Sequence, residues 1–207
     1  MKRLVVMLWT IMLLLGLSDT SMALLLCGQD IITAPASVKD DAAVNWHQQA
    51  FDEQQNVLLE KDLLVDGGLI QAGTYVSSHM IFLNTPCWAL FPVIDTGVVW
   101  RFDDVVLGVM SDYCGKLEAA SSGLLGAVGT EYSGAFGGRG LECGDGYVIN
   151  GNSLTVCMTT VEPGDWIRVI TQGHGPAPVP EPATMALLGM GLIGMAGLAR
   201  KKMVTVQ

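Results

Sequence analysis

The sequence predicts an all-β body, folded as an antiparallel β-sandwich or a jelly roll. Three observations predict this class. Apolar and polar residues alternate with a period of two through much of residues 24–172. Segments rich in β-branched and aromatic residues recur at a spacing of roughly ten residues. Asp-Gly, Asn-Gly and Pro-Gly turn signals separate these segments. Regularly spaced strands with glycine-rich turns are typical of sandwiches and jelly rolls.

The expected strands share this alternation, or a short β-rich run that ends at a turn signal. They are residues 57–65, 75–83, 98–102, 105–110, 147–149, 154–159 and 166–171. Residues 117–125 are the one segment expected to form a short helix, although its Ser-Ser-Gly stretch is unfavourable to helix. The sequence contains no internal repeat.

The C-terminal segment has a different character. Val179-Pro180-Glu181-Pro182 precedes an uncharged apolar run over residues 183–199, and Arg200-Lys201-Lys202 follows it. As a helix this run would measure roughly 26 Å, which is at the short end for crossing a hydrocarbon core of about 30 Å. The prolines prevent the helix from extending backwards. The basic cluster is the expected cytoplasmic stop-transfer signal.

The order of these elements in residues 179–202 resembles the PEP-CTERM sorting signal of proteins exported by Gram-negative bacteria. The resemblance implies recognition of Pro180, Glu181 and Pro182 by a membrane-bound exosortase. It further implies cleavage near these residues, so that the membrane anchor is transient and the body reaches the cell surface or the exopolysaccharide matrix. The alternative is an ordinary C-terminal anchor behind a proline linker. We therefore expect residues 173–182 to be a linker with the sorting motif and 200–207 to be a basic cytoplasmic tail.

The N-terminus predicts export. Lys2 and Arg3 precede an apolar run over residues 4–17, and Ser21-Met22-Ala23 supplies small residues for signal-peptide cleavage. We expect cleavage after Ala23. A retained anchor is the alternative, but polar residues 18–20 interrupt the apolar run early for a full span. Residues 24–172 would then form the β-rich ectodomain.

The charge of this body restricts its partners. Residues 24–179 contain six Lys or Arg and 18 Asp or Glu, a formal charge near −12. Such an acidic surface argues against nucleic acid, whose phosphates require basic side chains. It also disfavours anionic membrane surfaces. It is compatible with a hydrated matrix, with cations or with neutral polysaccharide.

Five cysteines remain after the predicted cleavage, and their spacing does not indicate a metal site. In an exported protein disulfides are the default expectation. Cys143 and Cys157 flank an Asn-Gly-Asn turn, so we expect them to face each other across a hairpin. Cys87 and Cys114 lie in loop-like surroundings and form the second expected pair. Cys27 would remain unpaired.

A second pattern is carried by residues 76–84, 100–103, 107–112 and 162–171. These segments look like one uncharacterised type of PEP-CTERM ectodomain, and the resemblance covers most of the mature chain, from Ala50 to Thr171. It implies a shared β-rich fold and no known activity. The cysteines are not part of this pattern.

The search for catalytic chemistry yields no candidate. His79 shares a strand face with apolar and hydroxyl side chains, without a local acid and nucleophile, so we expect a structural histidine. The glycine-rich residues 134–140 lack the strand-to-helix context of a phosphate loop, and their Arg139 is isolated in the sequence. We expect a flexible surface loop there. No hydrolase motif is present, so we expect no enzyme and no cofactor.

Two hypotheses follow for the body. The first is a non-catalytic surface or matrix protein associated with exopolysaccharide, as in a biofilm. The second is a lectin-like module that binds glycans through Trp88, with or without calcium at turn carboxylates. Trp88 lies in a loop, whereas Trp100 and Trp166 fall on strands and are expected in the core. The turn carboxylates are Asp103, Asp104, Asp112 and Asp145.

Overall fold

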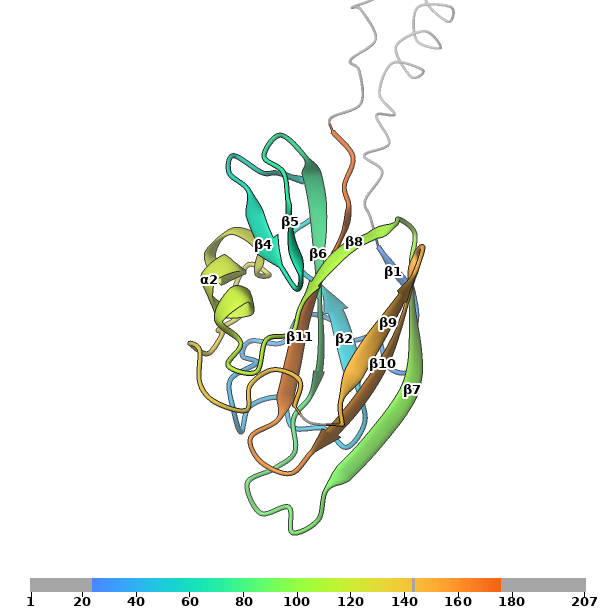
Figure 1. Ribbon diagram of the computed structural model, residues 1–207. Helices are drawn as coiled ribbons and strands as arrows, with labels where there is room; N and C mark the ends of the chain where they lie inside the picture. The colour runs from blue at the N-terminus through green and yellow to red at the C-terminus, as the bar shows by residue number, and fades with distance from the viewer. Residues whose placement is uncertain (1–23, 143, 176–207) are drawn as a thin grey trace, which may run out of the picture. The chain divides into compact units, whose positions relative to one another are not determined.

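The computed structural model describes residues 24–142 and 144–175. These residues form antiparallel β-sheets with one short helix (Figure 1). The elements are β1 (Leu25–Cys27), β2 (Gln49–Asp52), β3 (Val57–Leu58), β4 (Leu63–Val65), β5 (Gly68–Ile70), β6 (Tyr75–Leu83), β7 (Val93–Phe102), β8 (Val106–Met110), α2 (Lys116–Leu125), β9 (Gly146–Asn150), β10 (Ser153–Thr160) and β11 (Asp165–Gln172).

Two sheets provide the framework. The first has the strand order β1-β7-β10-β9 and the second β2-β6-β11-β8, with β3 also paired to β6. Every pairing between these strands is antiparallel. β4 and β5 form a separate hairpin. The β-rich antiparallel fold predicted from the alternation is therefore confirmed.

The largest core cluster joins the two sheets. In β10 the alternate residues Leu154, Val156 and Met158 are buried, while their neighbours are partly exposed. They pack with Trp100 of β7 and Ile167 of β11 in one cluster. A strand with this alternation has one face in the core and one toward solvent, as the period of two predicts. All three core clusters consist of residues from 24–175, so this stretch carries its own core.

The second sheet is buried on both faces. All residues of β6 from Val76 to Leu83 and all of β11 from Asp165 to Thr171 are buried. Two further clusters cover its outer side. One lies beneath the β4–β5 hairpin and α2, and the other includes Phe51, Phe82 and Trp166 with the partly buried Phe136. Continuous burial explains why these strands lack alternation in sequence.

Local chemistry explains where the helix begins. The Asp112 carboxylate accepts hydrogen bonds from the backbone N–H groups of Lys116 and Leu117, at 2.8 and 2.9 Å. These N–H groups have no intrahelical partner, so the carboxylate caps the helix. The preceding Gly115 adopts a left-handed conformation with φ of 61°. The short helix predicted at residues 117–125 is confirmed.

The membrane-related predictions lie outside the described residues. They are the signal peptide at 1–23, the apolar helix at 183–199 and the basic tail. Within residues 24–142 and 144–175, no helix has the length and apolar character needed to span a membrane.

Candidate functional site

An exposed aromatic patch lies at the loop that joins β6 to β7. We define the aromatic patch as Trp46, Trp88, Leu90 and Phe91. Trp88, Leu90 and Phe91 are 68, 84 and 78% exposed, and Trp46 is 49% exposed. The two indole rings lie 5.5 Å apart between centroids, tilted by 56°. Together with Ala89, the patch residues line an open hollow of about 230 Å³. The prediction that Trp88 is exposed and that Trp100 and Trp166 are buried is confirmed.

Hydrogen bonds beneath the patch hold its two halves together. The Asn45 backbone N–H donates to the Asn84 carbonyl at 2.8 Å, and the Asn84 N–H donates to the Asn45 side-chain oxygen at 2.8 Å. Both asparagines are buried. Asn45 directly precedes Trp46, and Asn84 opens the loop that carries Trp88. A turn closed by the Ala89 N–H and the Pro86 carbonyl then shapes this loop.

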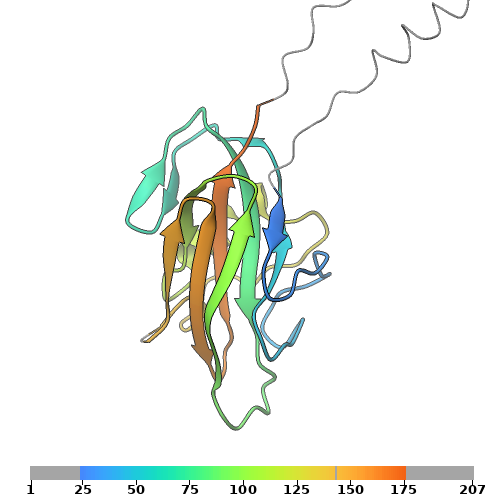
Figure 2. The ribbon, with the colours of Figure 1, turned by 90° about the vertical axis from the view of Figure 1, so that its right-hand side faces the viewer.

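The patch lies at the far end of the body from both chain exits. The Asp103 backbone N–H, just beyond the end of β7, donates a hydrogen bond to the Leu24 carbonyl. The Gly173 N–H donates one to the carbonyl of Tyr75, at the start of β6. The β6–β7 loop leaves the other end of these two strands. Nine residues of β6 separate the ends, which is roughly 30 Å of extended chain. Figures 1 and 2 show the described chain beginning and ending at the top and this loop at the bottom.

Comparison with known proteins adds one finding about the C-terminal segment. A family model described as the PEP-CTERM protein-sorting motif matches residues 178–201. The chain carries a PEP-CTERM sorting motif. This motif implies export to the surface or exterior of a bacterial cell and processing by an exosortase. No curated protein and no solved structure showed significant similarity to the chain.

Most residues of the predicted sorting signal fall within the matched range. Pro180, Glu181 and Pro182 lie inside it, as do Arg200 and Lys201 of the predicted stop-transfer cluster Arg200-Lys201-Lys202. All of them lie outside the described residues. The resemblance identified from the sequence is therefore confirmed by the family model, while its geometry is not described.

The predicted disulfide between Cys87 and Cys114 is not formed. Both cysteines are free, as are Cys27 and Cys157, and Cys143 lies outside the described residues. Cys87 is held in the β6–β7 loop, where its backbone N–H donates to the Asp41 carboxylate at 3.0 Å. Its thiol pKa is raised by a hydrogen bond with Asp41 and by that carboxylate's charge. Cys114 instead lies beside the start of α2.

The turn carboxylates considered for calcium do not converge. Asp104 pairs with His174 at 2.7 Å, Asp112 caps α2, and Asp145 accepts the Glu142 N–H at 3.2 Å. Each of these three carboxylates is engaged by a different local partner, and Asp103 is exposed. Among the described residues, no group of three His, Cys, Asp or Glu side chains is arranged to hold a metal ion.

His79 lies in an arrangement that superficially resembles a catalytic triad. Its Nδ1 is 2.6 Å from the Asp52 carboxylate, and its Nε2 is 3.0 Å from the Thr171 hydroxyl. The imidazole also packs on Phe102, with centroids 4.7 Å apart. His79 and Thr171 are completely buried. Because a nucleophile must reach its substrate, this geometry fits a structural histidine with both nitrogens satisfied, as predicted.

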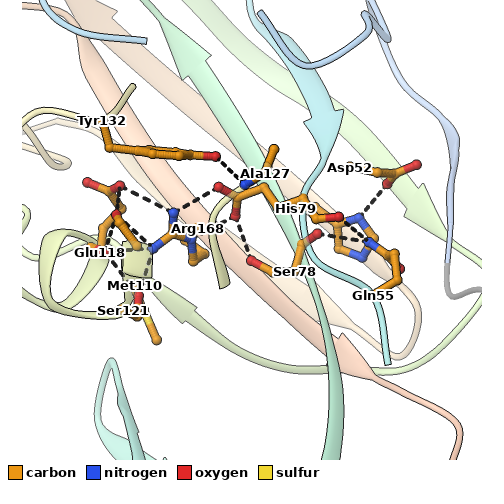
Figure 3. A network of polar contacts seen from close by, with 12 residues as sticks. Asp52, Gln55, Ser78, His79, Met110, Glu118, Ser121, Ala127, Tyr132 and Arg168 are labelled. Atoms are coloured by element: carbon orange, nitrogen blue, oxygen red, sulfur yellow. Dashed lines mark hydrogen bonds and ion pairs between the residues drawn. The ribbon is translucent and has the colours of Figure 1, made fainter. Parts of the chain in front are cut away.

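A buried charge network, which the sequence did not reveal, lies on the outer side of the second sheet. Figure 3 shows the part of it around Arg168 and Glu118. We define the buried charge network as Glu53, Glu118, Arg139 and Arg168. Arg168 binds Glu53 through two nitrogens, at 2.7 and 2.8 Å, and donates to the Glu118 backbone carbonyl at 2.6 Å. Arg139 donates to the Glu118 carboxylate at 2.7 Å. All four side chains are almost fully buried.

The expectation for residues 134–140 is therefore right in part: the segment is a loop in which Gly134, Ala135 and Gly137 are exposed, but its Arg139 is neither exposed nor isolated. Arg139 is completely buried, and its guanidinium lies 4.6 Å from the Trp166 ring centroid. It is not isolated, because Glu118 reaches it from α2, 21 residues away. Through Arg139, this segment packs on Trp166 and so lies over the outer face of the second sheet. Only a glutamate facing inward from the first turn of α2 would have signalled this partner, and the sequence of a ten-residue helix indicates weakly which side chains face inward.

Proposed function

We propose that the exported body is a non-catalytic surface or extracellular-matrix protein that associates with exopolysaccharide through the aromatic patch. The exposed Trp46–Trp88 pair is the observation that carries this proposal. Aromatic faces bury well against the apolar faces of sugar rings, and their edges leave the sugar hydroxyls in water. Monomeric proteins seldom leave such a cluster uncovered unless it has a binding role.

The position of the patch supports this proposal. Within the body, the patch lies roughly 30 Å from the end at which the described chain begins and stops, at residues 24 and 175. A glycan bound at the patch would therefore not contact the residues through which the chain continues toward the sorting motif. We further propose that exosortase cleaves near Pro180–Pro182 in a Gram-negative cell, so that membrane anchoring by residues 183–199 is transient.

The buried arrangement around His79 supports a non-catalytic role. The hydroxyl that would act as nucleophile belongs to Thr171, which is fully enclosed between the sheets. A glycan cannot reach it without unfolding the strand. The separate partners of the turn acids likewise give a calcium-assisted lectin no support, so we expect chelator to leave glycan binding unchanged.

Affinity measurements on residues 24–175 test the proposal. We expect retention by purified bacterial exopolysaccharide, and we expect Trp88→Ala to weaken it by about tenfold or more, as for a buried aromatic anchor. Trp46→Ala should weaken it to a similar extent. Val128→Ala is the matched control, because Val128 is 89% exposed and lies outside the patch. Equal retention of all three variants and the parent would refute the proposal.

A further inference from the structure

The aromatic patch has acidic neighbours on two loops. Asp40 and Asp41 lie on the loop before Trp46, and Glu162 lies on the turn between β10 and β11. All three are exposed. The Asp41 carboxylate binds the N–H of Cys87, the residue before Trp88. The Thr85 hydroxyl binds the Val161 carbonyl, which places the second loop beside the same segment.

The three carboxylates are close enough to influence one another. Partial burial and the charges of Asp40 and Asp41 raise the pKa of Glu162 to about 7. The basic residue of this region, Lys39, is already engaged by Glu131 at 2.6 Å. The surface beside the indole pair is therefore negative and crowded with like charge. A cation placed there would relieve that repulsion.

From this charge distribution we infer that the aromatic patch recognises polysaccharides that contain free amino sugars. The proposal rests on the proposed glycan-binding function and names the class of glycan. The indole faces would stack on the sugar rings, while Asp40, Asp41 and Glu162 face the ammonium groups. A cation beside an exposed tryptophan also gains from the ring quadrupole. Uronic-acid polymers would be repelled by the same carboxylates, and fully N-acetylated or neutral sugars would gain only the stacking.

Calorimetry with matched oligosaccharides tests this inference. The probes are glucosamine hexamer, N-acetylglucosamine hexamer and galacturonic acid hexamer, each titrated into residues 24–175 at low salt and at pH 7, where about half of the Glu162 carboxyls are ionised before a cation binds. We expect the glucosamine hexamer to bind about tenfold more tightly than its acetylated counterpart, and the galacturonic acid hexamer least tightly. Because the carboxylates are exposed, added salt should reduce this preference.

Charge variants supply the control. Asp40→Asn combined with Glu162→Gln should bring the two hexamers to within about threefold of each other, without weakening the acetylated one. Asp41 is left unchanged because it holds the Cys87 backbone. Glu60→Gln combined with Asp103→Asn removes the same formal charge from exposed positions away from the patch and should leave the preference intact.

The possible failures are distinguishable. If the acetylated hexamer binds in a Trp88-dependent way and the amino form binds no better, the charge inference is wrong and the proposed function stands. If no hexamer binds in a Trp88-dependent way, both are wrong. Sedimentation of the same samples tests a second copy as the occupant. A dimer that Trp88→Ala abolishes, without glycan binding, would overturn the inference.

Discussion

The buried charge network and the aromatic patch invert the usual distribution of residues in opposite ways. The network places four charged side chains where water is excluded, and the aromatic patch places large apolar side chains where water is present. Buried charge and exposed apolar clusters are the two informative departures from normal burial. Every charge in the network has an opposite partner, whereas the described residues leave the patch uncovered.

This difference separates stability from binding. A buried ion pair stabilises a fold only while both partners remain, because removal of one leaves an uncompensated charge. The network also joins α2 and the segment after it to the second sheet. Glu118 lies on α2, Arg139 on the following segment and Arg168 on β11. The patch contributes little to the core, so its residues are free to be selected for contact with a partner.

The largest expected effect comes from breaking the network. Glu53→Gln should lower the free energy of unfolding by about 3–5 kcal/mol, because Arg168 would remain buried with its bidentate partner neutralised. Chemical denaturation of residues 24–175 measures this change. Lys39→Gln is the control, since it breaks an ion pair that is exposed on both sides and should leave the midpoint nearly unchanged. A small effect for Glu53→Gln would mean that the network is dispensable.

The next effect concerns pH. Burial, with the charges of Asp145 and Glu142, raises the pKa of Asp165 to about 9. The folded state then binds one more proton than the unfolded state between about pH 4 and pH 9. The contribution of protonated Asp165 to the free energy of unfolding is fully present below this window. It falls as pH rises through the window, by at most about 1.4 kcal/mol per pH unit. Melting temperatures at pH 5 and pH 8 measure the decline.

Asp165→Asn isolates the source of that pH dependence. Asp165 Oδ2 is buried without a hydrogen-bond partner, so a neutral amide of similar shape removes the titrating group at this position. We expect the variant to lose most of the difference between pH 5 and pH 8. A parent protein that is more stable at pH 8 than at pH 5 would contradict the assignment.

The smallest effect on stability is expected in the aromatic patch. Trp88→Ala should change the free energy of unfolding by less than about 0.5 kcal/mol, because the side chain is mostly exposed. Chemical denaturation of Trp88→Ala and Trp100→Ala, each compared with the parent, measures the two changes. Trp100 is fully buried and its indole N–H binds Gln48 at 3.1 Å, so that variant should lose about 3–5 kcal/mol. A comparable loss in both would show that Trp88 is structural.

The sequence predicted the regular elements better than the sites. The strand at residues 75–83 and the short helix were found because their own residues carry the signal. Strands β1, β2 and β5 were missed, since each is short and gains its stability from pairing with another strand. The single strand expected at residues 57–65 is two short strands, because β3 pairs with β6 and β4 with β5. The first half of β7 was also missed, because the alternation there is interrupted at Gly97 and by a register shift opposite β10.

The sites were predicted only in part because their partners are distant in sequence. Trp88 was recognisable from its loop, but Trp46, which lies 5.5 Å from it, occurs in a polar segment without periodicity. The bond between Arg168 and Glu53 joins residues that are 115 positions apart. Such pairings arise from tertiary packing, and a single sequence contains no local pattern that specifies them.

One measurement tests the central claim directly. The exported body contains four tryptophans, and their indole N–H groups give separate signals in a two-dimensional NMR spectrum. On titration with exopolysaccharide, we predict that the signals of Trp46 and Trp88 shift together while those of Trp100 and Trp166 remain in place. Unchanged signals for Trp46 and Trp88, or equal shifts for all four, would contradict a binding role for the aromatic patch.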